Sequence, residues 1–246
     1  MGDVHSFWIE RDVLNQKLGG GFPSGSLVLA KGASSSGKSI TCQRICFGLL
    51  ENDVSVTYIS TQLTTKGFIF QMQTLDYSIA KHLTSGRLLF IPVLPLTQKI
   101  KPRSNFIHRL IAAKSLFTNN AIIIDTISSL ISHSIDKQKT TDLVNFLKKT
   151  VSFEKTIILA IDTDMLDPEV MNLFSSASNI YLELKKNLEM GDLRYTIFVN
   201  KFASTQTKVT QIIGFLIEYR SPTHHPDDQQ LRIRYYDMKN EAHYKR

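Results

Sequence analysis

The chain has 246 residues, of which 42% are hydrophobic and 21% are charged, and its formal net charge is +7 at pH 7. This composition is ordinary for a soluble globular protein with a substantial core, and no apolar run approaches the length that spans a bilayer. Residues 1–8 lack the basic and apolar regions of a signal peptide, so we expect a cytoplasmic protein. The positive charge permits an anionic partner without identifying it.

Apolar runs alternate with helical patterns along most of the chain, which predicts an α/β protein. A short amphipathic helix is expected over residues 9–18, ended by Gly19-Gly20-Gly21. The next predicted elements are strands at 26–31, 54–60, 88–91, 121–125 and 156–161, alternating with helices at 40–50, 64–75, 104–117 and 140–154 and a short helix opened by Asp167-Pro168. Strands without intervening helices follow at 180–184, 195–201, 212–219 and 231–236. We predict a single domain over residues 1–246, with a mostly parallel central sheet flanked by helices and a C-terminal antiparallel extension.

The segment from Gly32 to Ser39 has the spacing G-x-x-x-x-G-K-S between a predicted strand and a predicted helix. This is the phosphate-binding P-loop, or Walker A motif, in the context that it requires. Loop N–H groups would bind phosphate oxygens, Lys38 would reach the β- and γ-phosphates, and Ser39 would place its hydroxyl on Mg²⁺. The predicted nucleotide-binding residues are Gly32, Ala33, Ser34, Ser35, Ser36, Gly37, Lys38, Ser39 and Ile40. A Ser-rich surface turn is the alternative, but it does not explain the flanking strand and helix.

Asp125 ends an apolar strand that contains three consecutive isoleucines. Parallel strands deliver such residues to the carboxyl edge of the sheet, beside the P-loop. We therefore predict a Walker B carboxylate that holds Mg²⁺ through its waters. The alternative is a strand-end Asp that caps the next turn.

Hydrolysis needs a group that orients or deprotonates the attacking water. We expect it at the end of the strand next to the P-loop strand, where the residue is Gln62. An amide can orient water but cannot accept its proton, so slow turnover is predicted unless Asp162 or Asp164 helps. The spacing of Asp162, Asp164 and Asp167 also suggests a metal site, but caps and turns explain it better.

Cys42 and Cys46 are four residues apart on the helix after the P-loop, so they share one face. Because no further cysteine completes a four-ligand metal site, we expect reduced core residues.

The glycine-rich preamble Leu18-Gly-Gly-Gly-Phe-Pro-Ser-Gly-Ser26, together with the P-loop, resembles the RecA superfamily in its KaiC-like branch. Within that branch, residues 58–66 and 156–170 resemble the FlaH (ArlH) family of archaellum accessory proteins, and the tail around Val199-Asn-Lys-Phe202 also fits. The resemblance covers nearly the whole chain. It implies a RecA-like P-loop fold that binds ATP and Mg²⁺ through Lys38, Ser39 and Asp125.

The resemblance also implies a function, namely an ATP-binding regulatory and assembly subunit of the archaellum motor complex. Such a subunit would form a homo-oligomeric ring in the cytoplasm, peripheral to the membrane at the base of the archaellum. Its implied partners are the hexameric secretion-type motor ATPase, the membrane platform protein and the scaffold ring. ATP binding would control assembly, with weak or no intrinsic hydrolysis.

The sequence departs from the KaiC-like pattern at several positions. Gln62 stands where that pattern often has a catalytic Glu, and Ser35 replaces the usual central Gly, so we expect a loop less free to adopt positive φ. Lys201 matches a Lys that contacts a neighbour's phosphates in KaiC-like rings. Ala203 occupies the position of the accompanying Arg, which leaves an in-trans finger unsupported.

Two other functions are compatible with the P-loop. A RecA/RadA-like DNA-dependent ATPase needs basic or aromatic loops after the Walker B strand and after the next strand, here residues 132–139 and 162–167. The second loop is short and acidic, which is unsuited to phosphates, so no DNA is expected. A small-molecule kinase is the other alternative, but the sequence shows no Arg-rich lid.

Overall fold

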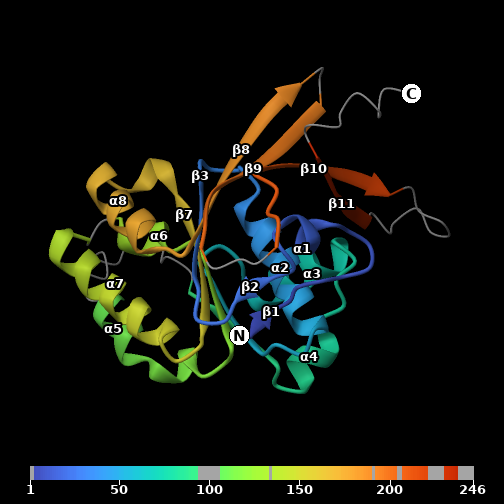
Figure 1. Cartoon of the computed structure of the whole chain (residues 1–246). Coiled ribbons are helices and arrows are strands. Elements are labelled where there is room, and N and C mark those ends of the chain that lie inside the picture. The colour runs from blue at the N-terminus through green and yellow to red at the C-terminus, as the bar shows by residue number, and fades with distance from the viewer. Residues whose placement is uncertain are drawn as a thin grey trace.

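In the described part of the chain, a nine-stranded sheet lies between two layers of helices (Figure 1). The computed structural model describes residues 3–93, 106–132, 135–189, 192–203, 207–220 and 230–237. In spatial order the strands are β11 (Gln230–Asp237), β10 (Ile212–Arg220), β9 (Asp192–Phe202), β8 (Ile180–Glu189), β3 (Leu27–Gly32), β7 (Thr156–Asp162), β6 (Ala121–Asp125), β4 (Val56–Ser60) and β5 (Leu88–Pro92). The predicted α/β class, with a mostly parallel central sheet, is confirmed.

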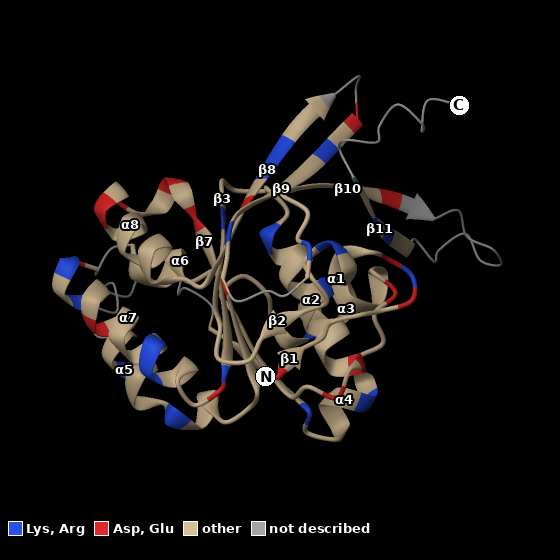
Figure 2. Ribbon diagram, viewed as in Figure 1, with Lys and Arg blue, Asp and Glu red and all other residues tan. Residues whose placement is uncertain are grey.

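The strands from β3 to β4 are apolar on both faces, as parallel strands covered by helices on both sides must be. Every residue of β6 and β4 is buried, and Figure 2 shows few charged residues on the strands between the helical layers. All the strands in this part of the sheet are parallel, from β8 beside β3 to β5 beside β4.

The predicted antiparallel extension is formed by β8 to β11. β8 is parallel to β3 on one side and antiparallel to β9 on the other. The β8–β9 hairpin projects beyond the helical layers, as Figure 1 shows, and near its end Leu188 pairs with Leu193. The extension therefore adds strands to the P-loop side of the sheet.

The helices divide between the two faces of the sheet (Figure 1). One layer contains α1 (Leu14–Lys17), α2 (Lys38–Glu51), α3 (Thr65–Thr74) and α4 (Ala80–Thr84), and the other contains α5 (Phe106–Ala112), α6 (Ser128–Ile131), α7 (Lys137–Val151) and α8 (Pro168–Ala177). Two 3₁₀ helices, η1 (Lys114–Phe117) and η2 (Thr163–Met165), and a two-stranded sheet of β1 (Val4–His5) and β2 (Phe22–Pro23) complete the elements of the described residues.

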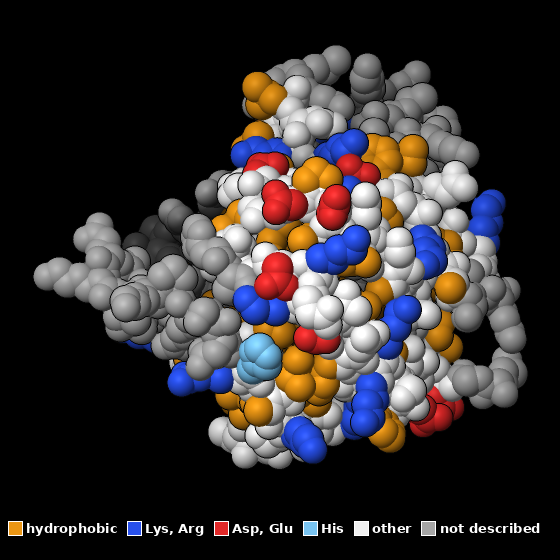
Figure 3. Space-filling model, turned by 90° about the vertical axis from the view of Figure 1, so that its left-hand side faces the viewer, with side chains coloured by type: hydrophobic (Ala, Val, Ile, Leu, Met, Phe, Trp, Pro, Cys, Tyr) orange, Lys and Arg blue, Asp and Glu red, His pale blue; other side chains and the backbone are white. Residues whose placement is uncertain are grey.

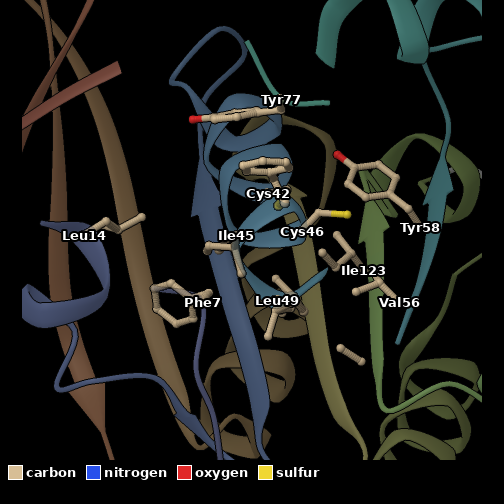
Figure 4. Close-up of a cluster of buried hydrophobic side chains, with 14 of the residues drawn as sticks. Phe7, Leu14, Cys42, Ile45, Cys46, Leu49, Val56, Tyr58, Tyr77 and Ile123 are labelled. Carbon is tan, nitrogen blue, oxygen red and sulfur yellow. The ribbon is translucent and has the colours of Figure 1, made fainter. Parts of the chain in front are cut away.

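Helix α2 forms the centre of one hydrophobic core. Figure 4 shows Cys42, Cys46 and Leu49 of this helix facing Tyr58 and Ile123 of the sheet. Both cysteines are free and buried, and burial raises the pKa of each thiol. They are therefore free thiols in the core, as predicted.

The helix predicted over residues 9–18 is wrong in extent, because only Leu14–Lys17 is helical. The Asp12 carboxylate accepts from the backbone N–H of Leu14 and also binds the buried guanidinium of Arg44. Asp12 is thus held by a long-range ion pair, and the helix begins only after it. Tertiary contacts override the local amphipathic pattern here.

Other predicted elements differ only at their ends. Helix α7 begins at Lys137, three residues before the predicted start, because the side chain of Asp136 caps the N–H of Lys139. Of the predicted helix 104–117, residues 104 and 105 lie outside the described residues, and the remainder consists of α5 followed by η1. The short elements β1, β2, α4 and α6 were not predicted. Within the described ranges, no helix combines the length and apolarity needed to cross a membrane.

Candidate nucleotide-binding site

The predicted P-loop connects the end of β3 at Gly32 to the start of α2 at Lys38. Gly37 is in the left-handed region, with φ of 91°, and a Cβ there would lie 2.7 Å from Cζ of Phe215. Glycine is therefore required at this position both by the backbone and by the packing of β10. Ser35 also has a positive φ, 60°. Ser35 thus adopts a conformation that glycine reaches more readily, and the expectation of a loop less free to take positive φ stays a prediction.

Lys38 lies inside the loop that it belongs to. Its Nζ donates to the carbonyl oxygens of Gly32 at 2.8 Å and of Ala33 at 2.6 Å, and lies 3.7 Å from Oδ2 of Asp162. Burial lowers the pKa of Lys38, while Asp162 and Asp125 act in the opposite direction. A buried ammonium at the floor of a phosphate-binding loop is the charge that a triphosphate requires.

Ser39 and Asp125 are brought together from segments 86 residues apart. The Ser39 hydroxyl donates to Oδ1 of Asp125 at 2.9 Å, and the Tyr58 hydroxyl donates to Oδ2 at 2.8 Å. Burial raises the pKa of Asp125, and the bonds from Tyr58 and Ser39 partly oppose this. Mg²⁺ prefers such hard oxygen ligands, so the pair fits the metal that a P-loop site uses.

A cavity of about 290 Å³ opens over the loop. Its lining consists of residues 34–40, Gln62, Gln71, Thr126, Asp162 and Tyr195. Of the predicted nucleotide-binding residues, Ser34 to Ile40 line this cavity, whereas the carbonyls of Gly32 and Ala33 hold Lys38. The loop, the Ser39–Asp125 pair and Gln62 are thus at one site, at the carboxyl ends of β3, β4, β6 and β7, where ligands bind in open α/β sheets.

Gln62 lines the cavity, but the prediction that its strand lies next to the P-loop strand is wrong. Its strand, β4, is not next to β3, because β7 and β6 lie between them. The order of parallel strands in space is set by the crossover connections, so sequence neighbours need not be sheet neighbours. The side chain of Gln62 is exposed and reaches the cavity from the end of β4.

The three aspartates at and after the end of β7 have separate environments. Asp162 lies beside Lys38 and also caps η2 by accepting from the N–H of Asp164, while Asp167 is the N-cap residue of α8. No group of three or more metal-ligating side chains occurs among the described residues. The hydrogen bond from the N–H of Asp164 to Asp162 and the N-cap position of Asp167 fit the interpretation of these aspartates as cap and turn residues. Asp162, the strand-end carboxylate of β7, is the one that lines the cavity.

Lys201 does not line the cavity of its own chain. It lies on β9, and its Nζ donates to the carbonyl oxygen of Ser178 between α8 and β8. Its expected contact with a neighbour's phosphates stays a prediction.

Four residues of the site were missed by the sequence analysis, namely Tyr58, Gln71, Thr126 and Tyr195. Tyr195 stacks on Phe215, with ring centroids 5.0 Å apart, and both rings pack beside Gly37. Thr126 directly follows the Walker B position, which was an available signal. Tyr195 is far from the loop in sequence, so no spacing in the chain indicates its role.

A family model described as "ATPase: KaiC" matches residues 12–220, which is most of the chain. The chain belongs to the KaiC-like family. A solved structure of a KaiC-like protein from Pyrococcus horikoshii superposes with a TM-score of 0.68 at 14% identity and covers 95% of this chain and 99% of its own. At that identity it supports the RecA-like fold alone.

More similar members of the KaiC-like family are called archaeal flagellar ATP-binding protein FlaH. The protein from Methanocaldococcus jannaschii is 36% identical over 210 residues, which is 85% of this chain and 90% of the relative, and that from Methanococcus voltae is 32% identical over 85% and 91%. The crystal structure of flagellar accessory protein FlaH from M. jannaschii superposes with a TM-score of 0.83 at 35% identity and covers 88% of this chain and 96% of its own. Within the KaiC-like family, the chain therefore belongs with the FlaH proteins.

Proposed function

We propose that this protein is an ATP-binding regulatory and assembly subunit of an archaellum motor complex, in which nucleotide binding rather than rapid hydrolysis is the working step. The observation that carries the proposal is the loop geometry. Lys38, the N–H groups at the start of α2 and the Ser39–Asp125 pair converge on one cavity. The archaeal flagellar names of the similar FlaH proteins support the cellular setting.

ATP would bind with its phosphates against residues 34–40. Lys38 would turn from the loop carbonyls toward the β- and γ-phosphates, and Mg²⁺ would be held by Ser39 directly and by Asp125 through water. Tyr195 lies at the edge of the cavity and offers a ring against which part of the nucleoside can pack. These roles use only groups that line the cavity or support its lining.

Slow hydrolysis follows from the side chains near the cavity. Gln62 is an amide and cannot take a proton from water. Asp162 is the carboxylate among the lining residues, but its Oδ2 lies 3.7 Å from Nζ of Lys38, so it faces the P-loop ammonium.

In the complex, we propose a homo-oligomeric ring on the cytoplasmic side of the membrane, with the motor ATPase, the membrane platform protein and the scaffold ring as partners. The DNA-dependent ATPase alternative is less well supported. The chain from the end of β7 to the start of α8 contains Asp162, Asp164 and Asp167 and includes the short helix η2. On the face shown in Figure 3, the basic side chains of the described residues are interspersed with acidic and apolar ones.

The experiment that tests the proposal is calorimetry of the full chain with Mg–ATP. Lys38→Ala should weaken binding by roughly 100-fold or more, because charge-assisted hydrogen bonds to the phosphates are lost. Lys149→Ala, which removes an exposed lysine of α7, should bind like the wild type. Equal affinity of the Lys38 variant and the wild type would overturn the proposal.

The same purified chain tests the second part of the proposal. Phosphate release from Mg–ATP should be far slower than about 1 s⁻¹, the lower end of ordinary enzyme turnover. Sustained release by the isolated chain above that rate would show that catalysis, and not binding alone, is its activity.

A further inference from the structure

Helix α3 brings Gln71, a half-buried side chain that the motif analysis did not identify, to the cavity. Its Oε1 accepts from Nε2 of Gln43 on α2 at 2.9 Å. Gln43 is fully buried. The two glutamines therefore join α3 to the helix that starts at the P-loop.

The bond from Gln43 fixes the orientation of the Gln71 amide. Because Oε1 of Gln71 points to Gln43, its NH₂ group is left for the cavity. The Oε1 of Gln43 is itself buried with no hydrogen-bond partner among the described residues. Burying an unpaired amide oxygen costs stability, and an apolar side chain would avoid that cost. The Gln43–Gln71 pair thus lowers the stability of the fold, but it directs the NH₂ group of Gln71 toward the nucleotide site.

The position of Gln71 relative to the phosphates follows from α2. Gln43 lies four residues after Ser39, so the two side chains are one helical turn apart on the same face. Gln71, which contacts Gln43, lines the same cavity as Ser39, the residue that would hold Mg²⁺ beside the phosphates. Gln62 and Thr126 line the same cavity, from the ends of β4 and β6.

We propose that Gln71, held in position by Gln43, donates a hydrogen bond to the terminal phosphate of ATP and makes the site prefer ATP over ADP. This inference rests on the proposed function, because it assumes that the cavity binds a nucleoside triphosphate. Gln71 is a specificity residue that touches the ligand, and Gln43 is a positioning residue that acts through it. The preference would tie the position of α3 to the state of the nucleotide.

The decisive variant is Gln71→Glu, measured by calorimetry of the full chain with Mg–ATP and Mg–ADP separately. Glutamate retains an oxygen that accepts from Gln43, so only the donor facing the cavity is replaced by a second oxygen. The affinity for ATP should fall by about 10- to 100-fold, the effect of a hydrogen bond to a charged group, while that for ADP changes little. The matched control is Gln73→Glu, an exposed position on the same helix.

Two further variants separate positioning from structure. Gln71→Leu, which carries no charge, should also lower the ratio of ATP to ADP affinity. Gln43→Leu should lower it in the same direction but less, and the double variant should match Gln71→Leu alone because both act through one bond. An unchanged affinity ratio in both Gln71 variants would overturn the inference and leave nucleotide binding intact. If the wild type bound neither nucleotide, the proposed function itself would fail.

Discussion

At the scale of single residues, stability and function conflict most clearly at Asp125. Its carboxylate is 3% exposed and accepts from the hydroxyls of Ser39, Tyr58 and Thr126. These bonds satisfy its oxygens, but burial still raises its pKa, with the nearby Lys38 acting against the shift. The charge that would hold Mg²⁺ therefore destabilises the fold while no cation is bound.

Asp125→Asn should raise the unfolding temperature of the nucleotide-free protein by about 3 °C at neutral pH. Because the folded pKa is raised, the contribution of Asp125 to stability is most favourable below its unfolded pKa and is lost as the pH rises through the folded pKa. The gain of the variant should thus appear at neutral pH and vanish in acid, where the wild type is protonated. Thermal unfolding across a pH series measures this.

The control is Asp164→Asn, at an exposed position, which should produce no such pH-dependent gain. An Asp125→Asn protein that is less stable than the wild type at pH 7 would contradict the argument. The same variant should bind Mg–ATP more weakly, so stability and affinity should move in opposite directions.

At the scale of elements, the N-terminal segment before α1 is bound to α2 by hydrogen bonds and an ion pair. The fully buried guanidinium of Arg44 donates to Asp12 at 2.7 Å and to the carbonyl oxygen of Phe7 at 2.9 Å. The backbone approaches so closely that a Cβ on Gly48 would lie 2.2 Å from the same carbonyl oxygen. The residues before α1 thus form part of the support of the P-loop helix.

Arg44→Met should lower the free energy of unfolding by about 3–5 kcal/mol, because it leaves Asp12 buried without its partner. Adding Asp12→Leu should restore much of the loss, since two apolar side chains can replace a buried ion pair at little cost. Urea denaturation of the wild type and the two variants measures both steps. A double variant no more stable than Arg44→Met would show that the attachment of the N-terminal segment to α2 depends on the charges themselves.

At the scale of the whole molecule, the site is assembled from both the parallel and the antiparallel parts of the sheet. The Walker elements come from the parallel strands, whereas Tyr195 and Phe215 belong to the antiparallel extension and pack against Gly37. The extension thus forms one wall of the cavity. The P-loop is therefore in contact with strands that continue toward the projecting β8–β9 hairpin (Figure 1).

If nucleotide binding controls ring formation, the molar mass of the full chain should increase when Mg–ATP is added. Light scattering coupled to gel filtration measures the mass of the wild type with ATP, with ADP and with neither. Lys38→Ala should keep the mass of its nucleotide-free state under all three conditions. A wild-type mass that does not depend on the nucleotide would contradict the assembly role while leaving ATP binding untouched.

The sequence by itself determined the features that depend on local chemistry. The glycines and Lys38 of the P-loop, the apolar runs of the buried parallel strands and the acidic cap with Pro168 each depend on neighbours in the chain, so their spacing predicted the loop, the sheet and α8. The same holds for the change to consecutive strands after residue 179, which indicated the antiparallel extension.

Only the tertiary structure decided what depends on distant contacts. It separated β4 from β3 by two strands, shortened the first helix through the Arg44–Asp12 pair and joined Tyr58 to Asp125. It also brought Gln71 and Tyr195 to the cavity. The physical reason is that these contacts are made between side chains from segments far apart along the chain, and local spacing carries no information about which distant segments the closing of the core brings together.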